Sequence, residues 1–253
     1  WRNEYKNGKQ TIYHEYQQNN EKKKGYNRDD DGNKKYVGQP FRYYIKYQYQ
    51  TAEKISIGCL GEKDAGEDAW SATNKGFDFA SMYLQVNNIW KIKQINIGDY
   101  NANFGQGLVI GNSSLFGKSS NTTISILPKE GLKKHSSCNE NNFLRGAGMT
   151  FGIKSIESTF FVSHRKKDAN ISNQRITSFK TDGLHRTENE ISKKRNITEN
   201  ILGINLTYKR RQLQVGITAM FYHYSDTLSP ANLMYNRFRI SDDNQHFNIG
   251  INY

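Results

Sequence analysis

Residues 202–221 read LGINLTYKRRQLQVGITAMF, and this stretch decides the fold class. From Leu202 to Tyr208, and again from Leu213 to Phe221, every second residue is apolar or aromatic. Successive side chains of a strand point to opposite faces, so each half is typical of a strand with one apolar and one polar face. The basic residues at 209–211 separate the halves and indicate a short turn. The stretch therefore predicts an antiparallel hairpin.

The same alternation recurs along the chain and predicts about nine strands, many of them close to the roughly 9–11 residues that a membrane-spanning strand needs. We place these strands at 41–50, 55–59, 80–86, 89–97, 147–154, 158–162, 202–208, 213–221 and 247–253. The stretch at 89–97 is apolar and β-branched, but its period is less regular. Residues 1–40 are rich in Asn, Lys, Asp and Gln, so we expect a polar loop region there with a partial strand at 11–16.

The predicted connections alternate in length. Short ones fall at 51–53, 87–88, near 155 and near 210–211, and long ones at 62–78, 112–143, 167–199 and 225–245. Outer-membrane barrels combine tight turns on one side with long external loops on the other. A soluble β-sandwich, the main alternative, shares the period of two but has no reason to place every long loop at one end. The expected fold is therefore all-β: an antiparallel transmembrane β-barrel over residues 41–253, truncated at both ends.

In such a barrel the polar face of each strand points to the lumen, and the apolar face meets lipid. The lumen-facing candidates are basic or polar residues of the predicted strands: Arg42, Lys46, Gln48, Lys154, Asn205, Gln212 and Gln214. An excess of Arg and Lys in a lumen would attract anions. The formal net charge of +12 fits nucleic acid, anionic lipid headgroups or an acidic solute as partners, although solvated loop charge explains it as well.

Motifs for catalysis or metal binding are absent from the sequence. None of the 6 His lies in a His-Glu-x-x-His frame, and the 2 Cys do not form a Cys-x-x-Cys motif. Ser163 and His164 are adjacent, so they point to opposite faces of a strand and do not make a nucleophile–base pair. We expect no enzyme activity, no cofactor and no metal.

Three segments stand out for their motifs: 98–108 (GDYNANFGQGL), 139–147 (NENNFLRGA) and 182–191 (DGLHRTENEI). Together they resemble the barrel portion of large outer-membrane proteins of Bacteroidota-type bacteria, which are labelled helix-hairpin-helix domain-containing. The resemblance runs from about residue 83 to residue 253. It implies a bacterial outer-membrane barrel of poorly defined function. The helix-hairpin-helix segment, which grips DNA in other proteins, is not found in these residues, which puts a DNA-uptake role in doubt.

The segment at 182–191 also carries local signals of its own. Asp182-Gly183 indicates a turn, and Thr187 with Glu190 predicts a capping box for a short helix through Lys194. His185 and Arg186 are candidates for a functional contact of this loop. A loop packed against its own side chains is the alternative.

The sequence thus leaves three functions open. The first is an outer-membrane barrel acting as a channel, a transporter or the barrel component of an envelope complex, with membrane lipid, lipopolysaccharide and other envelope proteins as partners. The second is a binding protein whose basic loops contact DNA, lipopolysaccharide or another polymer. The third is a soluble, adhesin-like β-sandwich.

Overall fold

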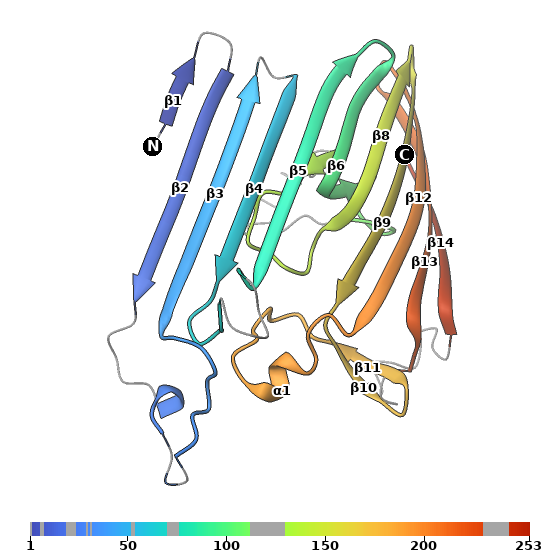
Figure 1. The fold of residues 1–253 in the computed structure, drawn as a ribbon. Helices are drawn as coiled ribbons and strands as arrows, with labels where there is room; N and C mark the ends of the chain where they lie inside the picture. Colours follow the sequence, from blue (N-terminus) through green and yellow to red (C-terminus); the bar gives the residue numbers. More distant parts are fainter. Residues whose placement is uncertain are drawn as a thin grey trace, which may run out of the picture.

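The protein forms one large, mostly antiparallel β-sheet that curves strongly without closing on itself (Figure 1). This computed structural model describes residues 2–5, 8–18, 24–28, 30, 32–51, 54–69, 76–111, 130–229 and 243–253. The wall strands are β1 (Arg2–Tyr5), β2 (Gly8–Gln18), β3 (Phe41–Thr51), β4 (Ile55–Lys63), β5 (Phe79–Ile89), β6 (Ile92–Asn103), β8 (Leu144–Ile153), β9 (Ile156–Lys167), β12 (Ile197–Arg210), β13 (Leu213–Leu228) and β14 (Asp243–Asn252). Shorter elements are β7 (Gly131–Lys134), β10 (Ala169–Ser172), β11 (Arg175–Phe179), the 3-10 helix η1 (Lys24–Tyr26) and α1 (Glu188–Ile191).

All nine predicted strands are present, and neighbours along the chain pair in antiparallel fashion. The connection expected at 87–88 is wrong, since these residues belong to β5 and the turn falls at 90–91, so the strand expected from residue 89 begins at Ile92. The hairpin predicted at 202–221 is confirmed as β12 and β13, with Leu206 opposite Ile217. The alternation of connections is confirmed too. Two-residue turns join β5 to β6, β8 to β9 and β12 to β13 at one end, and the described parts of the connections from β2 to β3, β4 to β5 and β9 to β12 lie at the other end (Figure 1).

The N-terminal region differs from the prediction. β2 spans 11 residues and pairs with β3 from Lys9↔Gln50 to Gln18↔Phe41, so the sheet begins well before residue 41. The partial strand expected at 11–16 is therefore a full wall strand. Its outward side chains include polar ones such as His14, which is why the apolar alternation understates its length.

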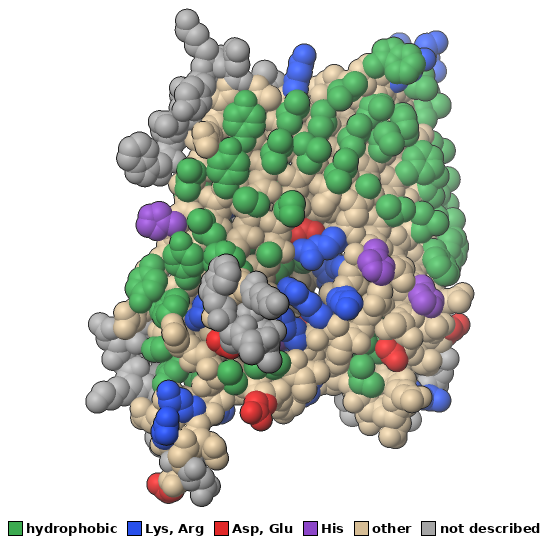
Figure 2. Space-filling view, in the orientation of Figure 1, with side chains coloured by type: hydrophobic (Ala, Val, Ile, Leu, Met, Phe, Trp, Pro, Cys, Tyr) green, Lys and Arg blue, Asp and Glu red, His purple; other side chains and the backbone are tan. Residues whose placement is uncertain are grey.

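The two faces of the sheet have opposite character. On β12 the side chain of Leu202 is 59% exposed and that of Leu206 47%, whereas the intervening Asn205 is only 3% exposed. Apolar side chains cover the outer, convex face over most of the strand length (Figure 2). Within the described residues all named strands belong to this one sheet, so no second sheet packs against that apolar face, as a β-sandwich would require.

The concave side is partly filled by the chain itself. β6 pairs with β5 only as far as Gly98↔Tyr83, and beyond that point it pairs with β7. Gly98 has φ +89°, and a Cβ there would lie 2.3 Å from the Met82 carbonyl oxygen, so this close approach requires glycine. Inside the curve a small apolar cluster forms from Tyr100, Ala102, Phe104, Ile110, Leu132, Leu144, Phe161 and Met220.

This filling corrects part of the expected loop pattern. The connection at 112–143 was expected outside the barrel, but its described part folds back beside the concave face. The Gln94 side-chain amide donates to the Leu132 carbonyl, and the Lys134 backbone N–H donates to the Gln85 side chain. Among the described residues, no helix has the length and apolar character that crossing a membrane would take.

Candidate functional site

Five of the predicted lumen residues lie on the inner face of the sheet, where each has a polar partner. Lys46 Nζ donates to the Ser136 carbonyl at 2.7 Å, and Gln48 Nε2 donates to the Tyr83 hydroxyl at 2.7 Å. The remaining pairs of this group are Arg42 with Glu62, Asn205 with Thr218, and Gln214 with Glu130. These bonds join strands of the wall to one another and tie the infolded segment to the wall.

Lys154 and Gln212 correct the prediction. Lys154 lies in the turn between β8 and β9 with φ +51°, and its side chain is exposed. Gln212 lies in the turn between β12 and β13 and is also exposed. Both were assigned to the lumen by extending the period of two beyond the last residue of a strand, where the chain turns and the alternation no longer defines a face.

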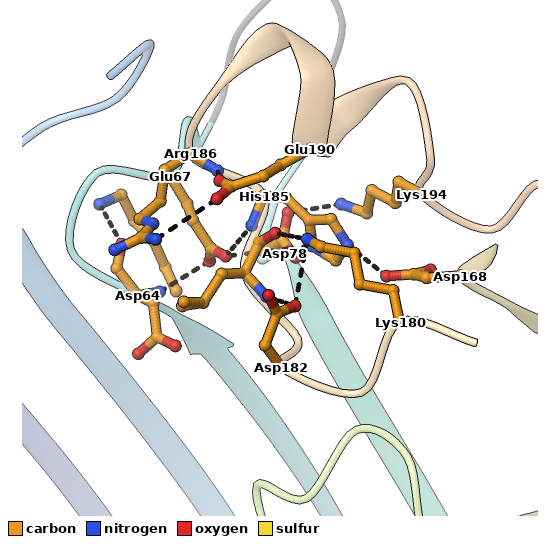
Figure 3. Close-up of polar contacts among 12 residues, drawn as sticks. Asp64, Glu67, Asp78, Asp168, Lys180, Asp182, His185, Arg186, Glu190 and Lys194 are labelled. Carbon is orange, nitrogen blue, oxygen red and sulfur yellow. Dashed lines mark hydrogen bonds and ion pairs between the residues drawn. The ribbon is translucent and has the colours of Figure 1, made fainter. Parts of the chain in front are cut away.

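His185 lies at the centre of a buried ionic cluster at the loop end of the sheet (Figure 3). Its Nδ1 is 2.6 Å from Asp78 Oδ2, and its Nε2 is 2.5 Å from Asp168 Oδ2. The backbone N–H of His185 donates to Glu67 Oε1 at 2.8 Å. Lys194 pairs with the other oxygen of Asp78. Two long connections that are far apart in sequence, from β4 to β5 and from β9 to β12, thus meet at one imidazole that is 3% exposed.

The carboxylates set the charge of this imidazole. Burial alone would lower the pKa of His185, but the hydrogen bonds to Asp168 and Asp78 outweigh burial and raise it to about 9. Burial tends to raise the pKa values of the two aspartates, yet the contacts with His185 hold both below their usual value. The cluster therefore contains a doubly protonated imidazolium between two carboxylates at neutral pH.

Two further acids of the loop end, Glu67 and Glu140, have pKa values that are raised and not lowered. Burial, followed by the charge of Asp78, raises the pKa of Glu67 to about 7. Burial, together with the charges of Asp78 and Glu67, raises the pKa of Glu140 to about 8. Both carboxyl groups thus cost less free energy to bury as the pH falls, because they become protonated and neutral.

Metal binding would compete with this arrangement. One ligand atom each from Glu67, Asp78 and His185 lie within 4.8 Å of one another, which is a donor set that a divalent cation accepts. Both imidazole nitrogens, however, are engaged by carboxylates at hydrogen-bond distance. A metal would have to displace a proton and the Asp78 contact. The geometry shown is therefore that of a cluster of ion pairs that holds the loops together.

The predicted capping box is confirmed. The Thr187 side chain accepts from the Glu190 backbone N–H, and the Glu190 carboxylate accepts from the Thr187 backbone N–H. α1 is shorter than expected and ends at Ile191, because the following N–H groups of Lys193 and Lys194 bond three residues back in tight turns. Arg186, the other candidate contact, pairs with Glu190 and lies over the Tyr36 ring.

The loop at 182–191 is therefore packed on itself and on the neighbouring loops, which is the alternative to a free contact surface. His185 was singled out from the sequence, whereas its role in the cluster was not. Its partners Glu67 and Asp78 carried no sequence signal. The expected separation of Ser163 and His164 is confirmed: Ser163 is buried on the inner face and His164 is exposed on the outer face.

Comparison of the chain with protein-family models, with curated proteins and with solved structures finds no match.

Proposed function

We propose that this chain forms part of the wall of a bacterial outer-membrane β-barrel whose interior is partly filled by its own infolded segment. The observation that supports this most directly is the inverted distribution of polarity. Large apolar side chains are exposed on the convex face, and Asn, Thr, Ser and His side chains are buried on the concave face. A soluble protein hides its apolar side chains, whereas a membrane barrel shows them to lipid.

The dimensions of the apolar face fit this proposal. On β13 the apolar outward positions run from Leu213 to Phe221, which is about 26 Å of strand at about 3.3 Å per residue. With the usual strand tilt of about 40°, this corresponds to a band about 20 Å high, close to the roughly 25 Å band of known barrels.

The band ends on the loop side at one polar level. Asn200 on β12 faces His164 on one side and His223 on the other, and His223 faces Gln245 on β14. The His164 Nδ1 and Asn200 Oδ1 atoms are 2.6 Å apart. A polar row that crosses neighbouring strands at one height is the pattern expected where hydrocarbon meets headgroups and water.

Within the proposed class, the structure favours a barrel component of an envelope complex over an open channel. The infolded segments 100–110 and 131–143 occupy the concave side, and their bonds engage inner polar groups such as Lys46 and Gln94. Among the strands that the structure describes, the edges of the sheet at β14 and at β1 and β2 have no partner, so a barrel would also need partners there. Binding of DNA or another polymer by the basic loops stays a second proposal that rests on net charge alone.

Membrane association provides the test. The protein, refolded in detergent and mixed with phosphatidylcholine vesicles, is expected to float with the vesicles and to resist extraction by 1 M salt and by alkaline carbonate, since the attachment is apolar. It should also migrate differently on a gel before and after heating. A folded monomer that stays in solution without detergent would contradict the proposal.

A further inference from the structure

A notch interrupts the wall at the loop end of the apolar band. The pairing of β5 with β6 stops at Tyr83, although β5 begins at Phe79. The pairing of β8 with β9 stops at Ser163, although β9 continues to Lys167. In the described part of the chain, the start of β5 and the end of β9 therefore lack strand partners on the sides that face this gap.

Arg145 spans the upper edge of the notch. Its Nε and Nη2 atoms donate to the two carboxylate oxygens of Asp99 at 2.7 and 2.8 Å, and Nη2 also donates to the Ala80 carbonyl of β5 at 2.9 Å. The guanidinium is thus fixed between β8, β6 and β5. Its side chain stays 42% exposed while that of Asp99 is 2% exposed, so the cation and not the anion faces the surroundings.

The notch is a hollow lined mainly by cations, visible as a group of basic side chains beneath the apolar band (Figure 2). Its charged lining consists of Arg145, Arg165, Lys166, Lys167, Arg195, His185, Glu140 and Asp168. Arg165 and Lys167 share Glu199 as a counter-ion. Lys166 and Arg195 are exposed at the mouth of the hollow.

Directly above the notch, the outer face offers an apolar surface. Met82 is 69% exposed on β5 and Val162 is 46% exposed on β9. Arg145 lies on this same outer face, because it is next to Gly146, which pairs with the inward-facing Ser163. Lys166 lies there too, because it is four residues beyond the outward-facing Val162 on β9. Fixed cations next to exposed apolar side chains match a molecule with an anionic head and hydrocarbon tails.

We propose that the wall notch binds the phosphate headgroup of an anionic membrane lipid, whose acyl chains lie along the outer face above it. Arg145 presents a guanidinium held in place by Asp99, and the exposed Lys166 supplies a second cation for the phosphate. Arg195 supplies a third, whose Nη2 donates to the Asp78 carbonyl at 3.0 Å at the mouth of the hollow. This inference rests on the proposed membrane location. It gives a joint role to the three segments that carry the family resemblance, because Asp99, Arg145 and His185 come from one segment each and lie in or beside the notch.

Lipid binding can be measured by native mass spectrometry of the protein in a maltoside detergent. We expect phosphatidylglycerol to bind at least about tenfold more tightly than diacylglycerol, which has the same tails and no phosphate. The double variant Lys166→Gln/Arg195→Gln should lose about tenfold in phosphatidylglycerol affinity. The matched control Lys154→Gln/Arg210→Gln, which removes the same charge from exposed positions at the short-turn end, should bind as the wild type does.

Three outcomes would overturn the inference: equal binding of the two lipids, equal loss in the control variant, or displacement of phosphatidylglycerol by millimolar inorganic phosphate, which would make the free ion the ligand. If the double variant does not fold, the affinity for phosphatidylglycerol is measured with Lys166→Gln alone, which should also bind this lipid more weakly than the wild type. These failures differ from failure of the proposed function, which would show as a protein that is folded and soluble without detergent.

Discussion

Ile204→Arg is expected to destabilise the membrane-embedded protein by about 2–4 kcal/mol, the cost of a cation near the middle of the lipid-facing band of a barrel. Ile204 lies on the outer face of β12 between Leu202 and Leu206, and its side chain is 41% exposed. In a soluble protein an exposed position of this kind tolerates substitution within about 0.5 kcal/mol. The two environments therefore predict clearly different results for the same change.

The measurement is the free energy of unfolding by guanidinium in lipid vesicles. Asn200→Arg is the matched control, because it places the same side chain on the same face of the same strand, at the polar level where a barrel tolerates Arg at about 0–1 kcal/mol. Equal effects of the two substitutions would show that Ile204 faces water.

The loop end is expected to loosen as the pH rises from about 6.5 towards 9. The folded protein raises the pKa of His185 above its ordinary 6.5 to about 9, so the stabilisation by the imidazolium is complete below pH 6.5 and is lost as the pH rises through 9. A rise of that size corresponds to a contribution on the order of 3 kcal/mol. Glu67 and Glu140 act in the same direction, but they titrate earlier, Glu67 around pH 7 and Glu140 around pH 8.

Trypsin cleavage at the basic residues 193–195 reports this loosening, with rates normalised to those of an unstructured peptide of residues 180–196. The wild type should be cut up to about a hundredfold faster at pH 9.5 than at pH 6.5. His185→Gln should be cut rapidly at pH 6.5 and show, between pH 8 and 9.5, only the small rise that comes from the remaining titration of Glu140. His14→Gln, a change at an exposed histidine of β2, should behave as the wild type does. A wild-type cleavage rate that does not change with pH would show that protonated His185 does not stabilise the loop end.

The features that were predictable from sequence are those set by local patterns. The alternation at 202–221 reflects which face of a strand is apolar, and a hairpin needs only neighbouring residues, so both strands and their pairing followed from that stretch. The capping box at Thr187 is equally local, since its two residues are three apart.

The features that escaped prediction depend on contacts between distant segments. His185 and Asp78 are 107 residues apart, and no spacing rule relates them. The infolding of residues 131–143 follows from the left-handed conformation of Gly98 and from bonds to Gln85 and Gln94 on strands that a sequence pattern does not place nearby. The ends of the strands were also predicted poorly, because the alternation does not show where a turn begins. Lys154 and Gln212, which lie in turns, illustrate this.

The most direct test of the central claim is the accessibility of nitroxide spin labels placed singly at positions 200–208 of β12 in lipid vesicles. Labels at 202, 204 and 206 should collide strongly with oxygen, which dissolves in lipid, and weakly with a water-soluble nickel complex, whereas labels at 203, 205 and 207 should be shielded from both. The label at 200 should respond to the nickel complex. Strong collisions with the nickel complex at 202, 204 and 206 would contradict a lipid-facing sheet.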